Sequence, residues 1–442
     1  MTQTAWVLSL TQFYLSLGFV LFFLALELGL TWVLFGLRLR AHGSTAALLA
    51  YRFWVRVFAL TLMLGFGASL PLVLQFGTLW PRIMDRAGEV VGPLVAMTVL
   101  TAFVFKSCFL GAMLYGQRSL SDWAHTLVVT MVAIGTSLTA YWIVTLLAWM
   151  QWPVGTALSE NHYQIADWLA LVGGAAPVLF GVLLTGGMVL AATLMLAVTA
   201  GRTDTRPSDE GDRSVYAIGL WLLVAALLLQ VALAVQLGRE LLPVQPARLA
   251  AVIPQWHSGP PDRLTLLAWL DVDALRNVWA LYGPQASDWL PPVMPGPLKG
   301  LNDLAPLGPP VWLTYASARL AALLAMLLVA AALWSLWQGS RQRYEPDVLT
   351  AGGRLRLRIM MWAAVALQAV GWGHVLVGSL PYAVYGAITL REVGTSQNQE
   401  TLWGGLVLHV IVYTVLALGF LQLLRHTTRF GVVPVARYRG RA

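Results

Sequence analysis

Long apolar runs alternate with short polar segments along nearly the whole chain. Nine runs of about 20 residues or more contain almost no charge, and each is long enough to cross the hydrocarbon core of a bilayer as a helix. We place these spans at 11–36, 54–77, 92–115, 124–149, 167–198, 214–237, 311–337, 358–380 and 402–424. The strict alternation typical of a membrane β-barrel is absent from the sequence. The pattern therefore predicts an all-α polytopic membrane protein with nine transmembrane helices.

The predicted spans are unevenly distributed along the chain. Residues 1–237 predict a six-helix membrane bundle, and residues 311–442 predict a three-helix membrane segment followed by a basic tail. A long loop at 238–310 separates helices six and seven, and such loops are usually functional or disordered. The loop is rich in proline, and its prolines include Pro243, Pro246, Pro254, Pro260, Pro261, Pro291, Pro292, Pro295 and Pro297. Because leucine and tryptophan also recur in it, we expect a folded cap.

The distribution of charge gives an orientation. Only 11% of the residues are charged, against about 25% in soluble proteins, which excludes an ordinary soluble enzyme. The first, third, fifth and seventh connections and the C-terminal tail, with the adjoining span ends, contain 18 of the 28 Lys and Arg residues. Because positively charged loops stay in the cytoplasm, we expect the N-terminus and the long loop outside and the C-terminus in the cytoplasm. The net charge of +8 thus reflects topology, and no nucleic-acid partner is expected.

Several short motifs in a consistent order carry a resemblance to a known family. They are Gln12-Phe13, Arg52-Phe53-Trp54, Gln75-Phe76-Gly77-Thr78, Ser137-Leu138-Thr139-Ala140, Trp149-Met150-Gln151 and Gln245-Pro246-Ala247-Arg248-Leu249-Ala250-Ala251. Over nearly all of its length the chain resembles subunit I of the cytochrome bd quinol oxidases. The resemblance implies the prokaryotic plasma (inner) membrane as location. It also implies that 238–310 is similar to the family's quinol-binding loop, where Arg248 replaces a lysine and is a candidate quinone contact.

The chain departs from that family where the family binds its three haems. The resemblance implies histidine, methionine and glutamate ligands, and aliphatic side chains cannot replace these lone-pair donors on haem iron. The corresponding positions are Val20, Thr98, Lys106, Pro177, Leu320 or Ala321, and Leu376. In addition, Ser379 stands at a family arginine, and Ile253 stands at a glutamate of the quinol loop. The ligand positions are lost systematically. In this respect the chain resembles a divergent subunit-I paralogue, which pairs with a complete subunit-I chain.

We therefore expect a haem-poor, subunit-I-like component of a cytochrome bd-type quinol:oxygen oxidoreductase complex, which stabilises a haem-bearing partner. The resemblance implies that the haem belongs to the partner chain, and that this chain alone is not catalytic. Expected partners are a haem-bearing subunit-I-like chain, small accessory subunits, membrane lipid and quinone. Two alternatives remain open: a redox-active subunit with replacement haem ligands, and a membrane ligand-binding or transport protein that reuses the emptied haem cavities. No catalytic residue or metal site is assigned.

Two charged residues within the spans need partners. Lys106 lies in the middle of the third span, where a charge costs about 3 kcal/mol or more. We expect it to form an ion pair with Glu27 of the first span, or to mark a proton path. Arg319 of the seventh span is expected to bind backbone carbonyls or a lipid headgroup; a propionate of a partner's haem is the alternative.

Two histidines lie deep within apolar runs. His374 and His409 are candidate replacement haem ligands, with a methionine such as Met97 or Met361, because imidazole binds iron well. The alternative is that both are hydrogen-bonded core histidines. The pairs Gly173-Gly174 and Gly186-Gly187 in the fifth span favour close helix packing over a nucleotide site.

Overall fold

A computed structural model describes residues 2–204, 206–259, 265–283, 299–304 and 308–430 of the chain. Within this described part, nine helices are long and apolar enough to cross a membrane, which confirms the predicted fold class. Seven of them are single helices: Gln3–Arg40 (α1), Thr45–Thr78 (α2), Asp122–Gln151 (α5), Glu210–Leu241 (α8), Val311–Arg341 (α11), Ala351–Val377 (α12) and Gln399–Phe430 (α14).

The other two spans are composite. Pro81–Tyr115 consists of α3 (Pro81–Thr101), a π-helical turn at Ala102–Ser107 and α4 (Cys108–Tyr115). Trp168–Arg202 consists of α6 (Trp168–Gly173) and α7 (Ala176–Arg202). Most helices extend beyond the predicted spans, because their polar ends continue outside the apolar run. Short 3₁₀ turns at Gly116–Arg118 and Pro346–Val348 lie in two of the connections.

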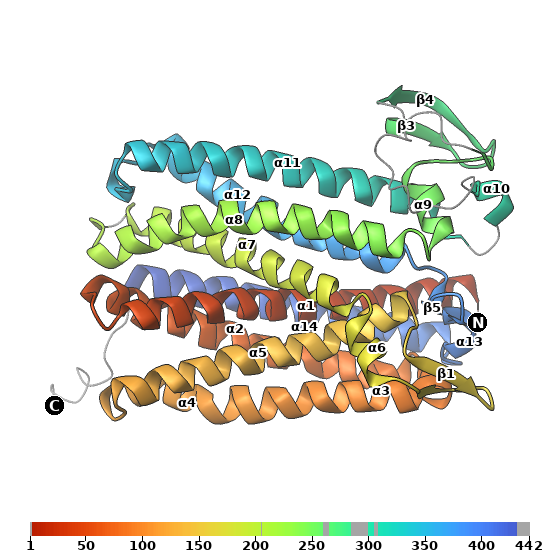
Figure 1. Ribbon diagram of the computed structural model, residues 1–442, viewed down its shortest axis with the longest axis horizontal. Coiled ribbons are helices and arrows are strands. Elements are labelled where there is room, and N and C mark those ends of the chain that lie inside the picture. The colour runs from red at the N-terminus through yellow and green to blue at the C-terminus, as the bar shows by residue number, and fades with distance from the viewer. Residues whose placement is uncertain (1, 205, 260–264, 284–298, 305–307, 431–442) are drawn as a thin grey trace.

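The long helices run side by side along the longest axis of the molecule, with α1 in the interior (Figure 1). In its most apolar window, 78% of the residues of α1 are buried, against 11% for α14. A helix that is apolar on all sides is typical of such a central position. One hydrophobic core joins residues from both predicted membrane segments, from Ala5 to Leu424.

The centre of the bundle depends on a close approach of α1 and α7. A Cβ atom added to Gly29 would lie 2.1 Å from the carbonyl oxygen of Gly187. Conversely, a Cβ atom on Gly187 would lie 2.1 Å from the carbonyl oxygen of Ala25. Only glycine allows two helix backbones to pack at this separation. The close packing predicted for the glycine pairs is therefore confirmed at Gly187, whereas a Cβ atom added to Gly173 would meet no atom within 4 Å.

In the described part of the chain, three short two-stranded hairpins lie at one end of the bundle, which we call the hairpin end (Figure 1). They pair β1 (Thr156–Ser159) with β2 (His162–Ile165), β3 (Thr265–Asp271) with β4 (Arg276–Tyr282), and β5 (Tyr382–Val384) with β6 (Ile388–Thr389), all antiparallel. The short helices at this end are α9 (Pro246–Val252), α10 (Leu301–Leu304) and α13 (Leu390–Val393). These strands of two to seven residues were not predicted, since such short runs carry little periodic signal.

The described part of the long loop is folded. Trp256, Leu270, Leu301 and Tyr315 form a small core beneath β3 and β4. The expectations for Pro260, Pro261, Pro291, Pro292, Pro295 and Pro297, and for the basic tail at 431–442, lie outside the described residues.

Candidate functional site

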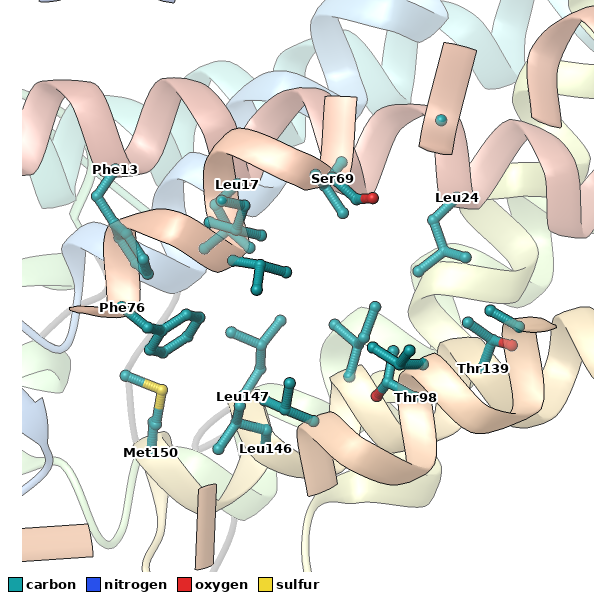
Figure 2. Close-up of a pocket in the computed structure, with 18 of the residues that line it drawn as sticks. Phe13, Leu17, Leu24, Ser69, Phe76, Thr98, Thr139, Leu146, Leu147 and Met150 are labelled. Carbon is teal, nitrogen blue, oxygen red and sulfur yellow. The ribbon is translucent and has the colours of Figure 1, made fainter. Parts of the chain in front are cut away.

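A cavity of about 660 Å³ lies among α1, α2, α3 and α5. Figure 2 shows side chains from these four helices pointing toward a common space. The labelled side chains are Phe13, Leu17 and Leu24 of α1, Ser69 and Phe76 of α2, Thr98 of α3, and Thr139, Leu146, Leu147 and Met150 of α5. Most of the wall is therefore aliphatic or aromatic.

Positions that the resemblance assigns to haem ligands converge on this cavity. Val20, Thr98, Lys106 and Leu376 all line it, and so does Ser379 at the position of the family arginine. They come from α1, α3, the π-helical turn, and α12 with the residues after it, which are far apart in the sequence. The convergence supports the correspondence made from the motifs. The other proposed positions, near Pro177 and Leu320, do not line this cavity.

The lining of the cavity does not fit haem ligation of the family's kind. The lining residues include no histidine, and the hydroxyls of Thr98 and Ser379 donate to the carbonyl oxygens of Leu94 and Leu376, 2.9 and 3.0 Å away. The carboxylate in the lining is that of Glu27, which is engaged by Lys106 as described next. Haem iron needs a free lone-pair donor, and the thioether of Met150 alone does not replace the missing set.

A buried ion pair closes one side of the cavity. Nζ of Lys106 lies 2.5 Å from Oε2 of Glu27, and the two side chains are only 5% and 3% exposed. Nζ also lies 5.4 Å from the centroid of the Phe66 ring. Gly65 of α2 leaves room for the Glu27 carboxylate, since a Cβ atom at this position would lie only 2.2 Å from Oε1 of Glu27. The ion pair considered from the sequence is thus present in the structure.

The π-helical turn carries Lys106. Its wider winding is visible at Cys108, whose backbone N–H donates to the carbonyl oxygen of Phe103, five residues earlier. Gly135 of α5 accommodates the turn, since a Cβ atom there would lie 2.0 Å from Cβ of Phe105. Such turns occur often at functional sites. The sequence analysis did not identify Gly65 or Gly135. The only local sign of their role is that each is a glycine inside an apolar span.

Both candidate histidines are hydrogen-bonded within the chain. In His409, Nδ1 lies 2.6 Å from the carbonyl oxygen of Gly405 and Nε2 lies 2.9 Å from Nε2 of Gln75. These contacts fit a tautomer in which Nδ1–H donates and Nε2 accepts. In His374, Nδ1 lies 3.0 Å from Oγ of Ser317. Neither histidine lines the cavity, so its geometry lends no support to haem ligation by either.

A second cavity of about 480 Å³ lies among α1, α7, α12 and α14. It is lined chiefly by aromatic and aliphatic side chains and includes Met361, but neither His374 nor His409. Met97, the other candidate methionine, is 40% exposed on α3. Neither cavity therefore brings an imidazole and a methionine together.

Arg248 forms a buried polar cluster at the hairpin end. It is 4% exposed, and its Nη1 donates to the side-chain oxygens of Gln245 and Gln151, 3.1 and 3.4 Å away. Its Nη2 donates to the carbonyl oxygen of His374 at 3.2 Å. Burial lowers the pKa of the Arg248 guanidinium to about 10, and the nearby Tyr385 acts in the opposite direction. The guanidinium therefore stays charged at neutral pH and ties α9 to α5 and α12.

Arg319 ties the long loop to α11. Its Nη2 donates to the carbonyl oxygens of Val252 and Thr265, at 3.1 and 2.6 Å. Its guanidinium also lies 4.9 Å from the centroid of the Tyr315 ring. Arg319 thus binds backbone carbonyls, which is one of the roles expected from the sequence.

We expect Arg248→Gln to lower the free energy of unfolding by about 1–3 kcal/mol, because three buried acceptors lose a charged donor. Denaturant unfolding in detergent micelles measures the effect. Arg276→Gln is the matched control, since that side chain is 72% exposed and should contribute little. Equal stability of the two variants would show that the cluster does not hold the loop.

Comparisons with known proteins give the family and the fold of the chain. The family model described as cytochrome bd terminal oxidase subunit I matches residues 8–432. The chain is 29% identical over 389 residues to cytochrome bd-II ubiquinol oxidase subunit 1 of Escherichia coli (strain K12), covering 86% of this chain and 73% of that one. It is 26% identical over 388 residues to cytochrome bd ubiquinol oxidase subunit 1 of Bacillus subtilis (strain 168), covering 83% and 80%. A chain of the bd oxidase structure from Geobacillus thermodenitrificans has the same fold, with a TM-score of 0.86 at 22% identity over 97% of this chain and 99% of that chain.

Proposed function

Because the chain belongs to the cytochrome bd terminal oxidase subunit I family, as its motifs predicted, we propose that it is a haem-poor component of a cytochrome bd-type quinol:oxygen oxidoreductase complex. In this proposal it packs against a haem-bearing subunit-I-like chain and stabilises it, together with small accessory subunits. Electron transfer from quinol to oxygen is then a property of the complex, and the haem belongs to the partner chain.

One observation carries the proposal. Four of the positions matched to the family's ligands gather around one cavity, yet they present Val20, Thr98, Lys106 and Leu376 instead of the family's iron donors. The described residues retain the family's fold with its nine candidate spans, while side chains that do not ligate haem iron occupy these matched positions. A retained fold with replaced ligands favours a role in assembly over a role in catalysis.

We further propose that the hairpin end faces outward and that the opposite end, with the C-terminus, faces the cytoplasm of a prokaryotic cell. The basic residues Arg202, Arg206, Arg354 and Arg358 lie near the ends of helices opposite the hairpin end, which supports this orientation. In the outward loop, Ile253 follows α9 where the family carries a glutamate. Without that proton acceptor we expect no quinol oxidation at this loop, although a quinone could still contact it.

Native purification tests the partnership. We expect a tagged chain, extracted in mild detergent, to co-purify with a second subunit-I-like chain whose sequence retains the family's histidine, methionine and glutamate ligands. Peptide mass spectrometry identifies that chain. A stable native preparation of this chain with no such partner would contradict the proposal.

A further inference from the structure

The cavity beside the ion pair is long. Along α1 its lining runs from Phe13 to Glu27, about 21 Å at a helical rise of about 1.5 Å per residue. Along α5 it runs from Thr139 to Gln151, about 18 Å by the same measure. The chains of one bilayer leaflet fill half of a hydrocarbon core about 30 Å thick, or about 15 Å. The cavity therefore runs parallel to the helices for about the length of a lipid chain.

The cavity opens sideways between α2 and α3. Several of its lining residues are half exposed or more: Leu70, Val73 and Leu74 of α2, Val99 of α3, and Phe103 of the π-helical turn that follows α3. Because these side chains border the cavity and also face outward, the opening lies between the two helices. They belong to the apolar middle of two membrane spans, so the opening faces the hydrocarbon region of a bilayer.

The interior offers contacts to an apolar chain and few to a polar group. The hydroxyls of Ser69, Thr98 and Ser379 donate to carbonyl oxygens of their own segments, and the charges of Glu27 and Lys106 engage each other. A polar molecule entering here would give up its hydration without new hydrogen bonds. Apolar cavities stay dry and accept apolar molecules instead, because side chains facing a void lose dispersion contacts.

We propose that this cavity binds one long aliphatic chain that enters from the bilayer between α2 and α3. The chain is the acyl chain of a phospholipid or the isoprenoid tail of a quinone, and its polar head stays outside the cavity. It lies against Leu17 and Val20, with the ion pair of Glu27 and Lys106 at one side of the cavity. The assignment does not depend on which partner binds the subunit, only on the absence of haem from this cavity.

Photolabelling of the native complex in nanodiscs tests the assignment. Two probes are used separately: a phosphatidylethanolamine with a diazirine at mid-chain, and a quinone with a diazirine in its isoprenoid tail. Leu17 and Val20 are 4% and 6% exposed, so bulk lipid cannot reach them from outside the bundle. We expect one or both probes to label peptides containing these two buried residues in the wild-type complex. Labelling by the lipid alone identifies an acyl chain, and labelling by the quinone alone identifies an isoprenoid tail.

A variant at the opening sharpens the test. Val73→Trp should reduce labelling of Leu17 and Val20 several-fold, because the indole obstructs the entry. Val235→Trp is the matched control, since Val235 is similarly exposed, lies on α8 and lines neither cavity. Labelling confined to outward-facing residues in the wild type, or equal labelling of the two variants, would overturn the proposal. Haem content is read from the same complex, so a failure here is distinguishable from a failure of the assembly role.

Discussion

Replacing Lys106 with methionine should lower the free energy of unfolding by about 3–5 kcal/mol, because it leaves a buried charge without its partner. The Glu27 carboxylate is 3% exposed, and among the described residues Lys106 is the cation that pairs with it, so the variant would leave this charge among apolar side chains.

 Water does not reach this carboxylate to replace the lost ion pair, so the substitution destabilises the folded state. Denaturant unfolding of the purified chain in detergent micelles measures the difference.

The double variant Glu27→Gln/Lys106→Met distinguishes the contribution of the ion pair to stability from that of side-chain packing. It removes both charges together, so it should recover most of the stability lost in the single variant. The exposed pair of Arg86 and Glu392, 3.6 Å apart, is the matched control: Arg86→Met should cost no more than about 1 kcal/mol. If the double variant is as unstable as Lys106→Met, the ion pair is not what stabilises this region.

Gly29→Ala should lower the free energy of unfolding by about 3 kcal/mol, at the upper end of the usual cost of overpacking. The added methyl group would lie 2.1 Å from the carbonyl oxygen of Gly187. A backbone carbonyl cannot rotate away as a side chain can, so α1 and α7 must separate at the centre of the bundle. Thermal unfolding in detergent measures the effect.

Gly36→Ala provides a control on the same helix. A Cβ atom at Gly36 meets no atom within 4 Å, so the substitution adds no clash there. Alanine also forms helices more readily than glycine, which predicts unchanged or slightly higher stability. Equal destabilisation by the two substitutions would contradict the close packing of α1 and α7.

The spans could be predicted because hydropathy is a local property of the chain. The pairing of Lys106 with Glu27 could also be anticipated, because a charge buried in a membrane needs a partner and few carboxylates lie within spans. The cavity could not be predicted, since Val20, Thr98 and Leu376 come together only through the packing of helices that are distant in the sequence.

The π-helical turn shows the same limit. Nothing in the sequence of Ala102–Ser107 distinguishes it from an ordinary helical segment, and the sequence predicts one continuous span at 92–115. The turn instead depends on tertiary context, because Gly135 of a different helix leaves space for Phe105. The three hairpins were missed for a related reason, since their short strands are fixed by packing at the hairpin end.

The haem content of each chain tests the central claim most directly. Reduced-minus-oxidised spectra would be recorded for the natively purified complex and for this chain alone, after circular dichroism has shown that the isolated chain remains helical. We expect haem in the complex and none in the isolated chain. Haem b retained by the folded, isolated chain would contradict the account, and His374 and His409 would then be the first residues to mutate.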